Sequence, residues 1–503
     1  MAVEFDGLRD FAFGPSQDIP LQTQLYQELK TRILNGRLVP EMRLPSTRSL
    51  SQSLSVSRNT VNGALEQLKA EGYIKTKPGA GHYVSDDIPD NFLRADSIVS
   101  ASIRPTCSRE LSLSSMGQSL MGNTPVRVYG NGSFEAGVPD LQAFPLQKWG
   151  QIYQRHSQRA SLLGYDCLQG YEPLRHVLAE YLRSSRGLLC SPDQVIITVG
   201  AQQAASIAIQ ILLENDDEVY VENPGYIGMR KAFEAHGVKP VGIPVGEQGI
   251  DVAALPRQPT GKLLCLTPTH QYPMGGIIPL ANRLKILQWA ADNGIWVLED
   301  DYDSEYHYDH KPIAAMQGLG LQEQVIYIGS FSKVLYPGLR LGYLVVPERL
   351  VGACVKAKNH MAGQTAIVEQ ATTAEFIETG QFVRHIRKMR MLYKDKQRAI
   401  LDSCREHLAD VGTPQYTGAG MHIVLTFRPE LCEKGLRDVD VVKEMTARNI
   451  FAGALSAYYL AQPLTQPLAQ PQHQGVVLGF ANTHVRDMSD KIKVIRQVID
   501  SLL

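Results

Sequence analysis

The sequence predicts a multidomain protein, in which a small N-terminal unit, mainly helical with a β wing, precedes a large α/β unit that ends in a smaller α+β lobe. Three observations support this fold class. The chain has 503 residues, several times the ~150 residues typical of one domain. Basic residues gather near its N-terminus. Beyond residue 125, short apolar runs alternate with helical patterns.

Changes of composition along the chain indicate the domain boundaries. We place the first unit at residues 16–85, a linker at 86–125 and the second unit at 126–503, because the linker segment is rich in Ser and lacks hydrophobic periodicity. Residues 21–84 hold nine Lys or Arg against four Glu, whereas the whole chain holds 50 Lys and Arg against 51 Asp and Glu. Nucleic-acid binding would therefore depend on this local basic region rather than on bulk charge.

The overall composition is that of an ordinary globular protein, with 44% hydrophobic and 20% charged residues. The 7 Cys are odd in number and form no CxxC pair, so we expect neither a disulfide framework nor a metal site. The N-terminus carries Glu4, Asp6 and Asp10 where a signal peptide needs a basic start and an apolar run, and no apolar run long enough to span a membrane follows. We expect a cytoplasmic protein without a membrane partner.

The segment 43–84 predicts two helices and a short hairpin. Ser46 can cap the first helix and Ser57 the second, whose apolar residues follow the spacing i, i+3, i+4, i+7 at Val61, Ala64, Leu65 and Leu68. This leaves three polar side chains on the outer face near the start of the second helix, where a recognition helix contacts bases: Arg58, Asn59 and Asn62. Residues 72–84 then predict two strands joined by the basic, glycine-bearing turn 77–80.

The motifs RLPSTRSL, VSRNTV and EGY resemble those of the winged helix-turn-helix of the GntR family of bacterial transcription regulators, over residues 21–84. The resemblance implies double-stranded DNA as the partner, with contacts from Arg43, Arg48, Arg58, Asn59, Thr60, Asn62, Lys77 and Gly79. Two positions depart from the family pattern, because Glu41 replaces the glycine usual before the Arg-Leu-Pro turn and Asn62 stands where some members have arginine. The alternative is a small helical cap whose arginines are only solvated.

Beyond residue 125, the alternation favours a largely parallel sheet with covering helices, among them 202–213 and 280–293. The expected strands are VIITVG, EVYVENP, KLLCLTP, IWVLEDD, VIYIGSFSK and LGYLVVP. Helices around 369–407 and 487–502, with strands near 420–426 and 475–481, predict the smaller α+β lobe. The Gln-Pro repeat AQPLTQPLAQPQHQ between the two strands indicates a mobile loop.

Several expected strand ends carry side chains suited to pyridoxal 5′-phosphate. This aldehyde cofactor needs a lysine amine to form an imine, an acid beside the pyridine nitrogen and a cradle for the phosphate. Lys333 ends the run YIGSFSK and Asp300 ends IWVLED, while the helix after VIITV begins with backbone N–H groups that suit an anion. Ligands of doubly wound sheets bind at the carboxyl ends of strands, so these groups are expected to converge. Each feature alone is weak, since a lone lysine or an Asp-Asp pair is more often a solvated surface group.

Residues 126–503 resemble the fold-type I aminotransferases, on the motifs GVPDLQAFP, TVGAQQA, EDDY and SFSKVLYPGLRLGY. The resemblance implies Lys333 as the catalytic lysine that binds the cofactor, Asp300 as the partner of the pyridine nitrogen, Tyr302 as the donor to the ring oxygen and Tyr226 as the stacking residue. It implies contacts around the phosphate from Gly200, Ala201, Gln202, Ser330, Ser332 and Arg340. A GntR-like unit joined to such a unit is the signature of the MocR subfamily, which implies a homodimer and a small-molecule effector.

Two positions depart from the aminotransferase pattern. In TPTHQYPMGG, His270, Gln271 and Tyr272 precede the proline where Asn-Pro-x-Gly is usual; His270 is a candidate cofactor contact, and its alternative is a buried histidine with satisfied partners. In the last strand, GVVLGFAN, Val477 stands where aminotransferases place the arginine that holds the substrate carboxylate, and an isopropyl group cannot hold an anion. The alternatives are a one-step alignment error or a substitute arginine, with Arg428 and Arg486 as candidates in this chain.

The sequence thus predicts a DNA-binding transcription regulator whose aminotransferase-like domain senses an amine, an amino compound or pyridoxal phosphate itself, with at most weak transaminase activity. The alternative is an active aminotransferase with an N-terminal DNA-binding appendage. The effector, the operator and the direction of regulation do not follow from the sequence.

Overall fold

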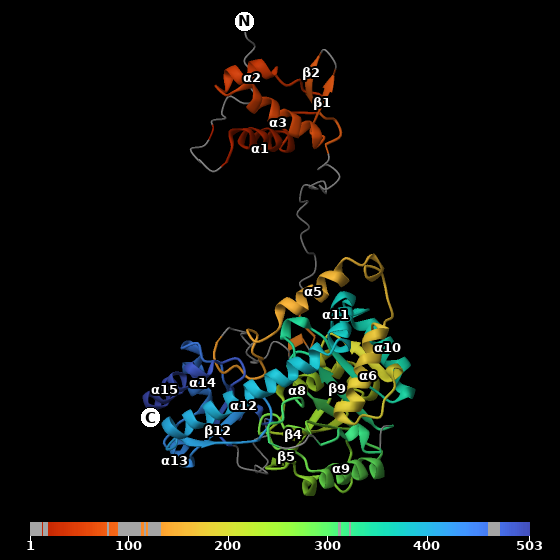
Figure 1. Ribbon diagram of the computed structural model, residues 1–503, viewed down its shortest axis with the longest axis vertical. Coiled ribbons are helices and arrows are strands. Elements are labelled where there is room, and N and C mark those ends of the chain that lie inside the picture. Colours follow the sequence, from red (N-terminus) through yellow and green to blue (C-terminus); the bar gives the residue numbers. More distant parts are fainter. Residues whose placement is uncertain are drawn as a thin grey trace. The chain divides into compact units, whose positions relative to one another are not determined.

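The computed structural model describes residues 13, 19–77, 80–88, 112–114, 117–118, 132–309, 313–320, 323–460 and 473–503 (Figure 1). Contacts divide the chain into two compact units, Met1–Ser112 and Leu113–Leu503. The predicted linker 86–125 and the Gln-Pro repeat fall largely outside the described residues. No helix within the described ranges is both long and apolar enough to cross a membrane.

The N-terminal unit contains three helices and a two-stranded hairpin: α1 (Leu21–Leu34), α2 (Thr47–Ser53), α3 (Arg58–Ala70), β1 (Ile74–Lys77) and β2 (Gly81–Val84). The strands pair antiparallel, from Ile74 opposite Val84 to Lys77 opposite Gly81. Both predicted N-caps are confirmed, because the Ser46 hydroxyl accepts from the Ser49 amide and the Ser57 hydroxyl from the Thr60 amide, each at 3.1 Å. The four predicted apolar residues of α3 are buried, together with residues of α1 and the hairpin.

A mixed eight-stranded sheet forms the centre of the second unit, in the order β3-β10-β9-β8-β7-β4-β5-β6. Its strands are β3 (Val195–Thr198), β4 (Glu218–Asn223), β5 (Lys239–Gly246), β6 (Gly249–Ile250), β7 (Leu263–Leu266), β8 (Trp296–Asp301), β9 (Val325–Ser330) and β10 (Gly342–Val345). All six predicted strands are present, and β10 runs antiparallel between β3 and β9. The sequence analysis missed β5, whose segment KPVGIPVG carries prolines and glycines that normally argue against a strand.

Helices cover both faces of this sheet (Figure 1). One face packs against α5 (Leu146–Ser157), α6 (Glu172–Arg186) and α11 (Ile367–Glu378), and the other against α7 (Ala201–Leu212), α8 (Ile227–Ala235) and α10 (Glu348–Ala362). A further cluster packs α9 (Leu280–Asn293) against β7 and β8. Successive strand residues are buried on opposite faces, as in sheets covered on both sides.

The C-terminal lobe contains an antiparallel sheet in the order β11-β12-β14-β13 with helices on one face. Its elements are α12 (Gln381–His407), β11 (Gly412–Pro414), β12 (His422–Phe427), α13 (Pro429–Glu433), α14 (Asp438–Ala447), β13 (Gly453–Ala454), β14 (Gly475–Gly479) and α15 (Val485–Leu502). One set of alternating residues, including Ile423 and Leu478, forms the lobe's own core. The opposite set, including Val424 and Val477, packs against Ala136 and Tyr458. Partly buried residues from the large-sheet segment, such as Tyr272, pack beside them.

Candidate functional site

The start of α3 presents the polar surface expected of a recognition helix. Arg58, Asn59 and Asn62 are exposed, while the opposite face of the helix is buried. Arg48 on α2 and Arg43 before it are exposed as well. Thr60 is half-buried, with its hydroxyl 2.8 Å from that of Ser57. The N-terminal unit thus carries exposed arginines and amides at one helix end, where phosphates and base edges can be reached.

Glu41 alters the basic wing beside this helix. Its backbone has φ of 64°, in the left-handed region that favours glycine, and glycine is the residue the sequence comparison expected there. Its carboxylate accepts from Lys77 Nζ at 2.9 Å and also pairs with Lys75. Lys77, a predicted DNA contact, is therefore held by an acid of its own chain, whereas Gly79 lies outside the described residues.

In the second unit, residues predicted to bind the phosphate lie around Gly342, the first residue of β10. Gly342 at the start of β10 lies opposite both Thr198, the end of β3, and Ser330, the end of β9. A Cβ on Gly342 would lie 2.7 Å from Gly200 Cα, and a Cβ on Gly200 3.7 Å from the Arg340 guanidinium. Arg340 donates to the Val199 carbonyl at 3.1 Å, and the Ser330 hydroxyl accepts from the Ser332 amide at 3.2 Å. These residues form a cradle of backbone N–H groups, hydroxyls and one guanidinium at the N-terminus of α7, beside Ala201 and Gln202.

Asp300 and Asp301, adjacent at the end of β8, have opposite surroundings. Asp301 accepts from Arg186 Nε at 2.8 Å and from the Tyr327 hydroxyl, so its charge is compensated. Asp300 is buried and lines a pocket, but its carboxyl has no hydrogen-bond partner among the described residues. Burial, with the nearby Asp301 charge, raises the pKa of Asp300 to about 7. A buried acid that faces a pocket without a donor suits a ligand that brings an N–H group.

Lys333 lies three residues beyond β9 and extends into the same region. Its Nζ donates to the Gly137 carbonyl at 2.8 Å, and a Cβ on Gly137 would lie 2.6 Å from that nitrogen. Gly137 has φ of 77°, so only glycine fits here without strain and without a clash with the lysine. The positive charge of Lys333 acts on Asp300 by lowering its pKa, against the larger effect of burial.

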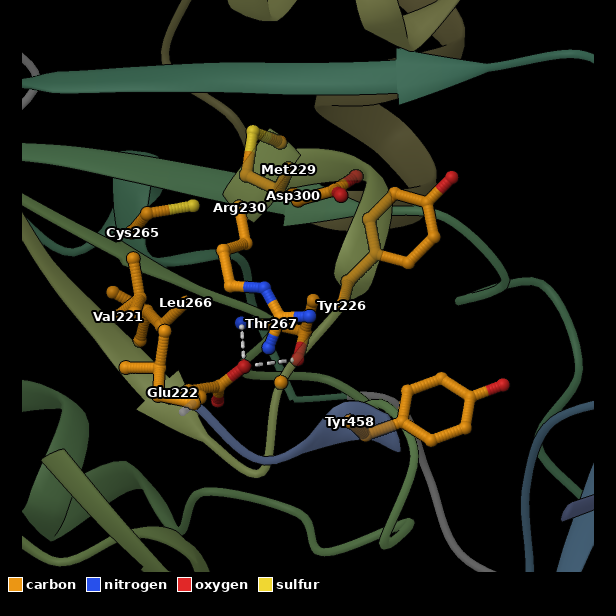
Figure 2. A pocket seen from close by; sticks show the side chains of 12 residues that line it. Val221, Glu222, Tyr226, Met229, Arg230, Cys265, Leu266, Thr267, Asp300 and Tyr458 are labelled. Carbon is orange, nitrogen blue, oxygen red and sulfur yellow. Dashed lines mark hydrogen bonds between the residues drawn. The ribbon is translucent and has the colours of Figure 1, made fainter. Parts of the chain in front are cut away.

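Tyr226 completes the pocket that Asp300 lines (Figure 2). It follows β4 and precedes α8, and a Cβ on Gly228 would lie 2.6 Å from its phenol oxygen and 2.8 Å from Gln202 Nε2. The structure therefore brings Tyr226 beside the start of α7. Tyr226 as a residue is 39% exposed, so its aromatic ring can contact a ligand at the pocket.

Glu222 is a pocket residue that the sequence analysis did not identify. Its Oε2 accepts from the Thr267 amide at 3.1 Å and from the Thr267 hydroxyl at 2.6 Å, while Oε1 is buried without a partner among the described residues. Burial raises its pKa to about 7, and the Asp300 charge adds to the rise. The motif ENPGY contains this glutamate at the end of β4, but no local sequence pattern indicates that it is buried.

His270 contacts Tyr302, the residue predicted to donate to the ring oxygen of the cofactor. Its Nδ1 is 2.9 Å from the Tyr302 hydroxyl and 3.0 Å from Asp303, and its side chain is buried. Tyr272, which directly precedes Pro273, lies among aromatic rings, with Tyr302 at 5.7 Å and Tyr458 at 5.5 Å between centroids. The structure thus brings His270 and Tyr302 together, with Tyr272 next to both.

Val477 is fully buried on the face of the small sheet that packs toward this region. Its neighbours are apolar or aromatic: Ala136, Val424, Leu455, Tyr458 and Tyr459. Arg428 and Arg486, named as substitutes for an arginine, are both exposed; Arg428 donates to the Ala409 carbonyl and Arg486 lies 3.4 Å from Asp487. Arg230 lines the pocket, but its guanidinium donates to the Tyr459 and Ala457 carbonyls.

Comparison with known proteins matches both units. Residues 21–84 match the gntR family of bacterial regulatory proteins, and residues 133–464 match the family of class I and II aminotransferases. The probable rhizopine catabolism regulatory protein MocR of Rhizobium meliloti is 34% identical over 96% of this chain and 95% of its own length. The pyridoxine biosynthesis regulator PdxR of Corynebacterium glutamicum is 29% identical over 89% of this chain and 91% of its own.

Among solved structures, the α-aminoadipate aminotransferase LysN of Thermus thermophilus superposes with a TM-score of 0.66 at 25% identity, covering 77% of this chain and 95% of LysN. The fold and site therefore define a helix-turn-helix transcription regulator with an aminotransferase-like domain of fold type I. Within that class, the chain belongs to the MocR group of GntR-type regulators.

Proposed function

We propose that the C-terminal unit binds pyridoxal 5′-phosphate through Lys333 and that occupancy of this site controls operator binding by the N-terminal unit. The observation that carries the proposal is Asp300, a buried carboxyl that faces a pocket and has no donor within the described part of the chain. The charge of the Lys333 amine acts on it and lowers its pKa. A protonated pyridine nitrogen supplies the missing N–H group, and the positive ring would hold Asp300 ionised.

The remaining residues fit the same group. The cradle around Gly342, with Gly200, Ser330 and Arg340, suits a phosphate dianion. Tyr226 offers a ring face beside it, and Lys333 offers the amine. Bound there, the cofactor would supply an aldehyde that accepts amines, and the protein residues would position it and exclude water.

The effector we propose is an amine without an α-carboxylate, or the cofactor itself. The sheet face that carries Val477 and Val424 is apolar, and the guanidinium of Arg230 is already held by two carbonyls. A carboxylate in this region would lose water without gaining a bidentate partner, which is unfavourable. We infer at most weak transamination of ordinary amino acids.

We also propose a homodimer, in line with the two half-sites that winged regulators read. The segment 160–168 carries Leu163 at 75% and Tyr165 at 100% exposure. Large apolar side chains that stand out from a surface in this way are typical of interfaces.

The test is covalent loading. The purified full-length protein should show a visible cofactor band, which borohydride fixes onto Lys333 as identified by peptide mass, and Lys333→Ala should lose the band on dialysis. A band retained by Lys333→Ala after dialysis would contradict the assignment. A keto-acid panel run on the same sample measures transaminase turnover and so tests the aminotransferase alternative.

A further inference from the structure

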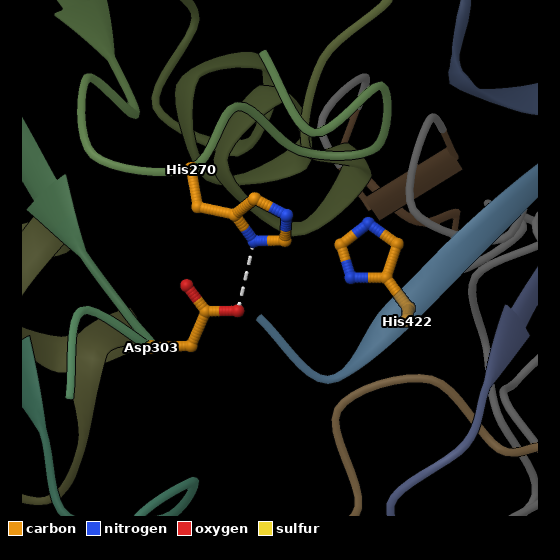
Figure 3. A group of neighbouring side chains, drawn as sticks. All are labelled: His270, Asp303 and His422. Atoms are coloured by element: carbon orange, nitrogen blue, oxygen red, sulfur yellow. Dashed lines mark hydrogen bonds and ion pairs between the residues drawn. The ribbon is translucent and has the colours of Figure 1, made fainter. Parts of the chain in front are cut away.

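Three buried polar side chains from separate parts of the fold, His270, Asp303 and His422, lie close together (Figure 3). Tyr302 contacts this group through His270. His270 lies between β7 and α9, Asp303 lies two residues beyond β8, and His422 begins β12. His270 Nδ1 is 3.0 Å from Asp303 Oδ2 and 2.9 Å from the Tyr302 hydroxyl. Two oxygens therefore compete for one ring nitrogen.

The nature of these two oxygens decides where the proton lies. Imidazole is a stronger base than carboxylate, so a shared proton stays on His270 Nδ1, and an ionised Asp303 can only accept. With Nδ1 protonated, the Tyr302 oxygen can accept from His270 but cannot donate to it. The phenol proton of Tyr302 is then free for an acceptor on its other side.

The far side of the His270 ring supports the same assignment. The Thr417 hydroxyl donates to the Ala419 carbonyl at 3.1 Å, so it offers a lone pair to His270 Nε2 at 3.3 Å. His422 instead donates from Nε2 to the Pro273 carbonyl at 2.8 Å, and burial lowers its pKa to about 3, so it stays neutral. Both ring nitrogens of His270 therefore face acceptors, Asp303 on one side and Thr417 on the other.

A metal ion is the other interpretation of this group, since the ligand atoms of His270, Asp303 and His422 lie within 4.8 Å of one another. However, His270 Nδ1 already contacts Asp303 and Tyr302, and His422 Nε2 contacts a backbone carbonyl. The hydrogen bonds account for these atoms without an ion.

We propose that Asp303, acting through His270, fixes Tyr302 as a hydrogen-bond donor toward the ring oxygen of the bound cofactor. Asp303 and His270 are positioning residues, and this role rests on the proposed function. Replacing Asp303 by Asn removes the anionic acceptor that holds a proton on Nδ1, so the neutral ring can keep its proton on Nε2, toward Thr417, and leave the Nδ1 lone pair to the Tyr302 hydroxyl. Tyr302 then donates to His270 and no longer to the ligand.

The test measures the pH midpoint at which the visible band of the cofactor-loaded, full-length protein changes. A donor to the ring oxygen stabilises its anionic form, so Asp303→Asn should raise this midpoint by about one pH unit, a tenfold change in proton affinity. The other titratable groups that act on this position are unchanged in the variant: Asp300, Glu222, Lys333, Tyr272 and His422. Tyr302→Phe should give a similar rise, and the variant with both substitutions should rise no further.

A rescue separates positioning from a merely structural role. His270→Leu combined with Asp303→Asn removes the competing acceptor, so Tyr302 donates to the ligand again and the midpoint should return toward that of the wild type. Asp309→Asn, which removes a charge from the same segment at an exposed position, should leave the midpoint unchanged.

The outcomes distinguish the two proposals. An unshifted midpoint in Asp303→Asn, additive shifts with Tyr302→Phe, or no rescue by His270→Leu would each overturn the role of Asp303 while leaving covalent loading intact. A wild-type protein without any visible band after loading would contradict the proposed function and, with it, this inference.

Discussion

Asp300 and Asp301 show how position on a strand separates two identical side chains. Successive residues of β8 point to opposite faces, so Asp301 reaches Arg186 and Tyr327 while its neighbour faces the pocket. The Arg186 guanidinium donates to one carboxylate, whereas no donor in the described part of the chain hydrogen-bonds to the other. The acid without a donor is the one that a cofactor would use.

The first prediction concerns Asp300 and pH. Its pKa rises from 3.8 to about 7 on folding without a ligand, so between these values the folded state keeps a proton that the unfolded state has lost. The free energy of unfolding should therefore fall as pH rises from 4 toward 8. Asp300→Asn removes this loss and should stabilise the cofactor-free protein at pH 8 by on the order of 4 kcal/mol, since one pKa unit corresponds to about 1.4 kcal/mol.

Urea unfolding of the cofactor-free protein at pH 5 and pH 8 measures the effect, and cofactor retention of the same variant should fall. Asp301→Asn is the matched control: it leaves Arg186 without its carboxylate and should destabilise at both pH values, by about 3 kcal/mol or more. Equal stabilities of wild type and Asp300→Asn at pH 8 would contradict the assigned pKa.

The second prediction concerns Val477. Matched pairs that differ only in the carboxylate, such as phenethylamine and phenylalanine, should perturb the visible band unequally. The concentration that half-converts the band should be at least roughly tenfold lower for the amine than for the amino acid, because no bidentate partner compensates the desolvated carboxylate. Val477→Arg should reduce or reverse this preference.

The amine and amino-acid pairs measured on the wild-type protein test the hypothesis by themselves, even if the buried arginine impairs folding of Val477→Arg. Rapid conversion of the band by common amino acids would defeat the hypothesis of a site without a carboxylate anchor.

At the scale of elements, the third prediction concerns Glu41 beside the wing and its effect on DNA binding. Glu41 pairs with Lys75 and Lys77 and adopts φ of 64°. Glu41→Gly should relieve the backbone strain and release Lys77 toward phosphates, whereas Lys75 keeps its pairing with Asp86 at 2.7 Å. DNA affinity should therefore rise, and the slope of log affinity against log salt should steepen by about 1. Fluorescence anisotropy on operator and random duplexes over a salt series measures both quantities.

Glu41→Asn separates charge from backbone, since asparagine tolerates the left-handed region and lacks the charge. It should retain the gain in affinity. Arg58→Ala is the contrasting variant, because loss of a base contact at the recognition helix should weaken specific binding by about 1–3 kcal/mol and spare random DNA. An unchanged salt slope in both Glu41 variants would show that Lys77 does not reach DNA.

The elements that the sequence predicted well are those with local signals. Caps at Ser46 and Ser57 and the apolar spacing of α3 depend on neighbours a few residues away, and the strand ends at Asp300 and Ser330 follow from apolar runs. The segment of β5 lacked such a pattern, because its prolines and glycines normally argue against a strand. The strand forms through its pairing with β4. The contact of His270 with Thr417 joins residues 147 positions apart, which no local pattern predicts.

At the scale of the whole molecule, a DNA-reading unit and an aminotransferase-like unit share one chain. The order of motifs predicted both units and their family, because each strand end carried a recognisable residue. The surroundings of those residues were not predictable: the burial of Glu222, the compensated charge of Asp301 and the apolar neighbours of Val477 arise only when distant elements pack.

Coupling between the two units is the central claim, and operator affinity in defined loading states measures it. Wild-type protein without cofactor, with pyridoxal phosphate, and with pyridoxal phosphate plus a responsive amine should bind operator DNA with affinities that differ by at least about fivefold, the usual lower range of allosteric coupling. Lys333→Ala should show one affinity in all three conditions. Identical wild-type affinities at matched salt, together with sustained turnover of amino and keto acids, would contradict a cofactor-controlled regulator and favour an aminotransferase with a DNA-binding appendage.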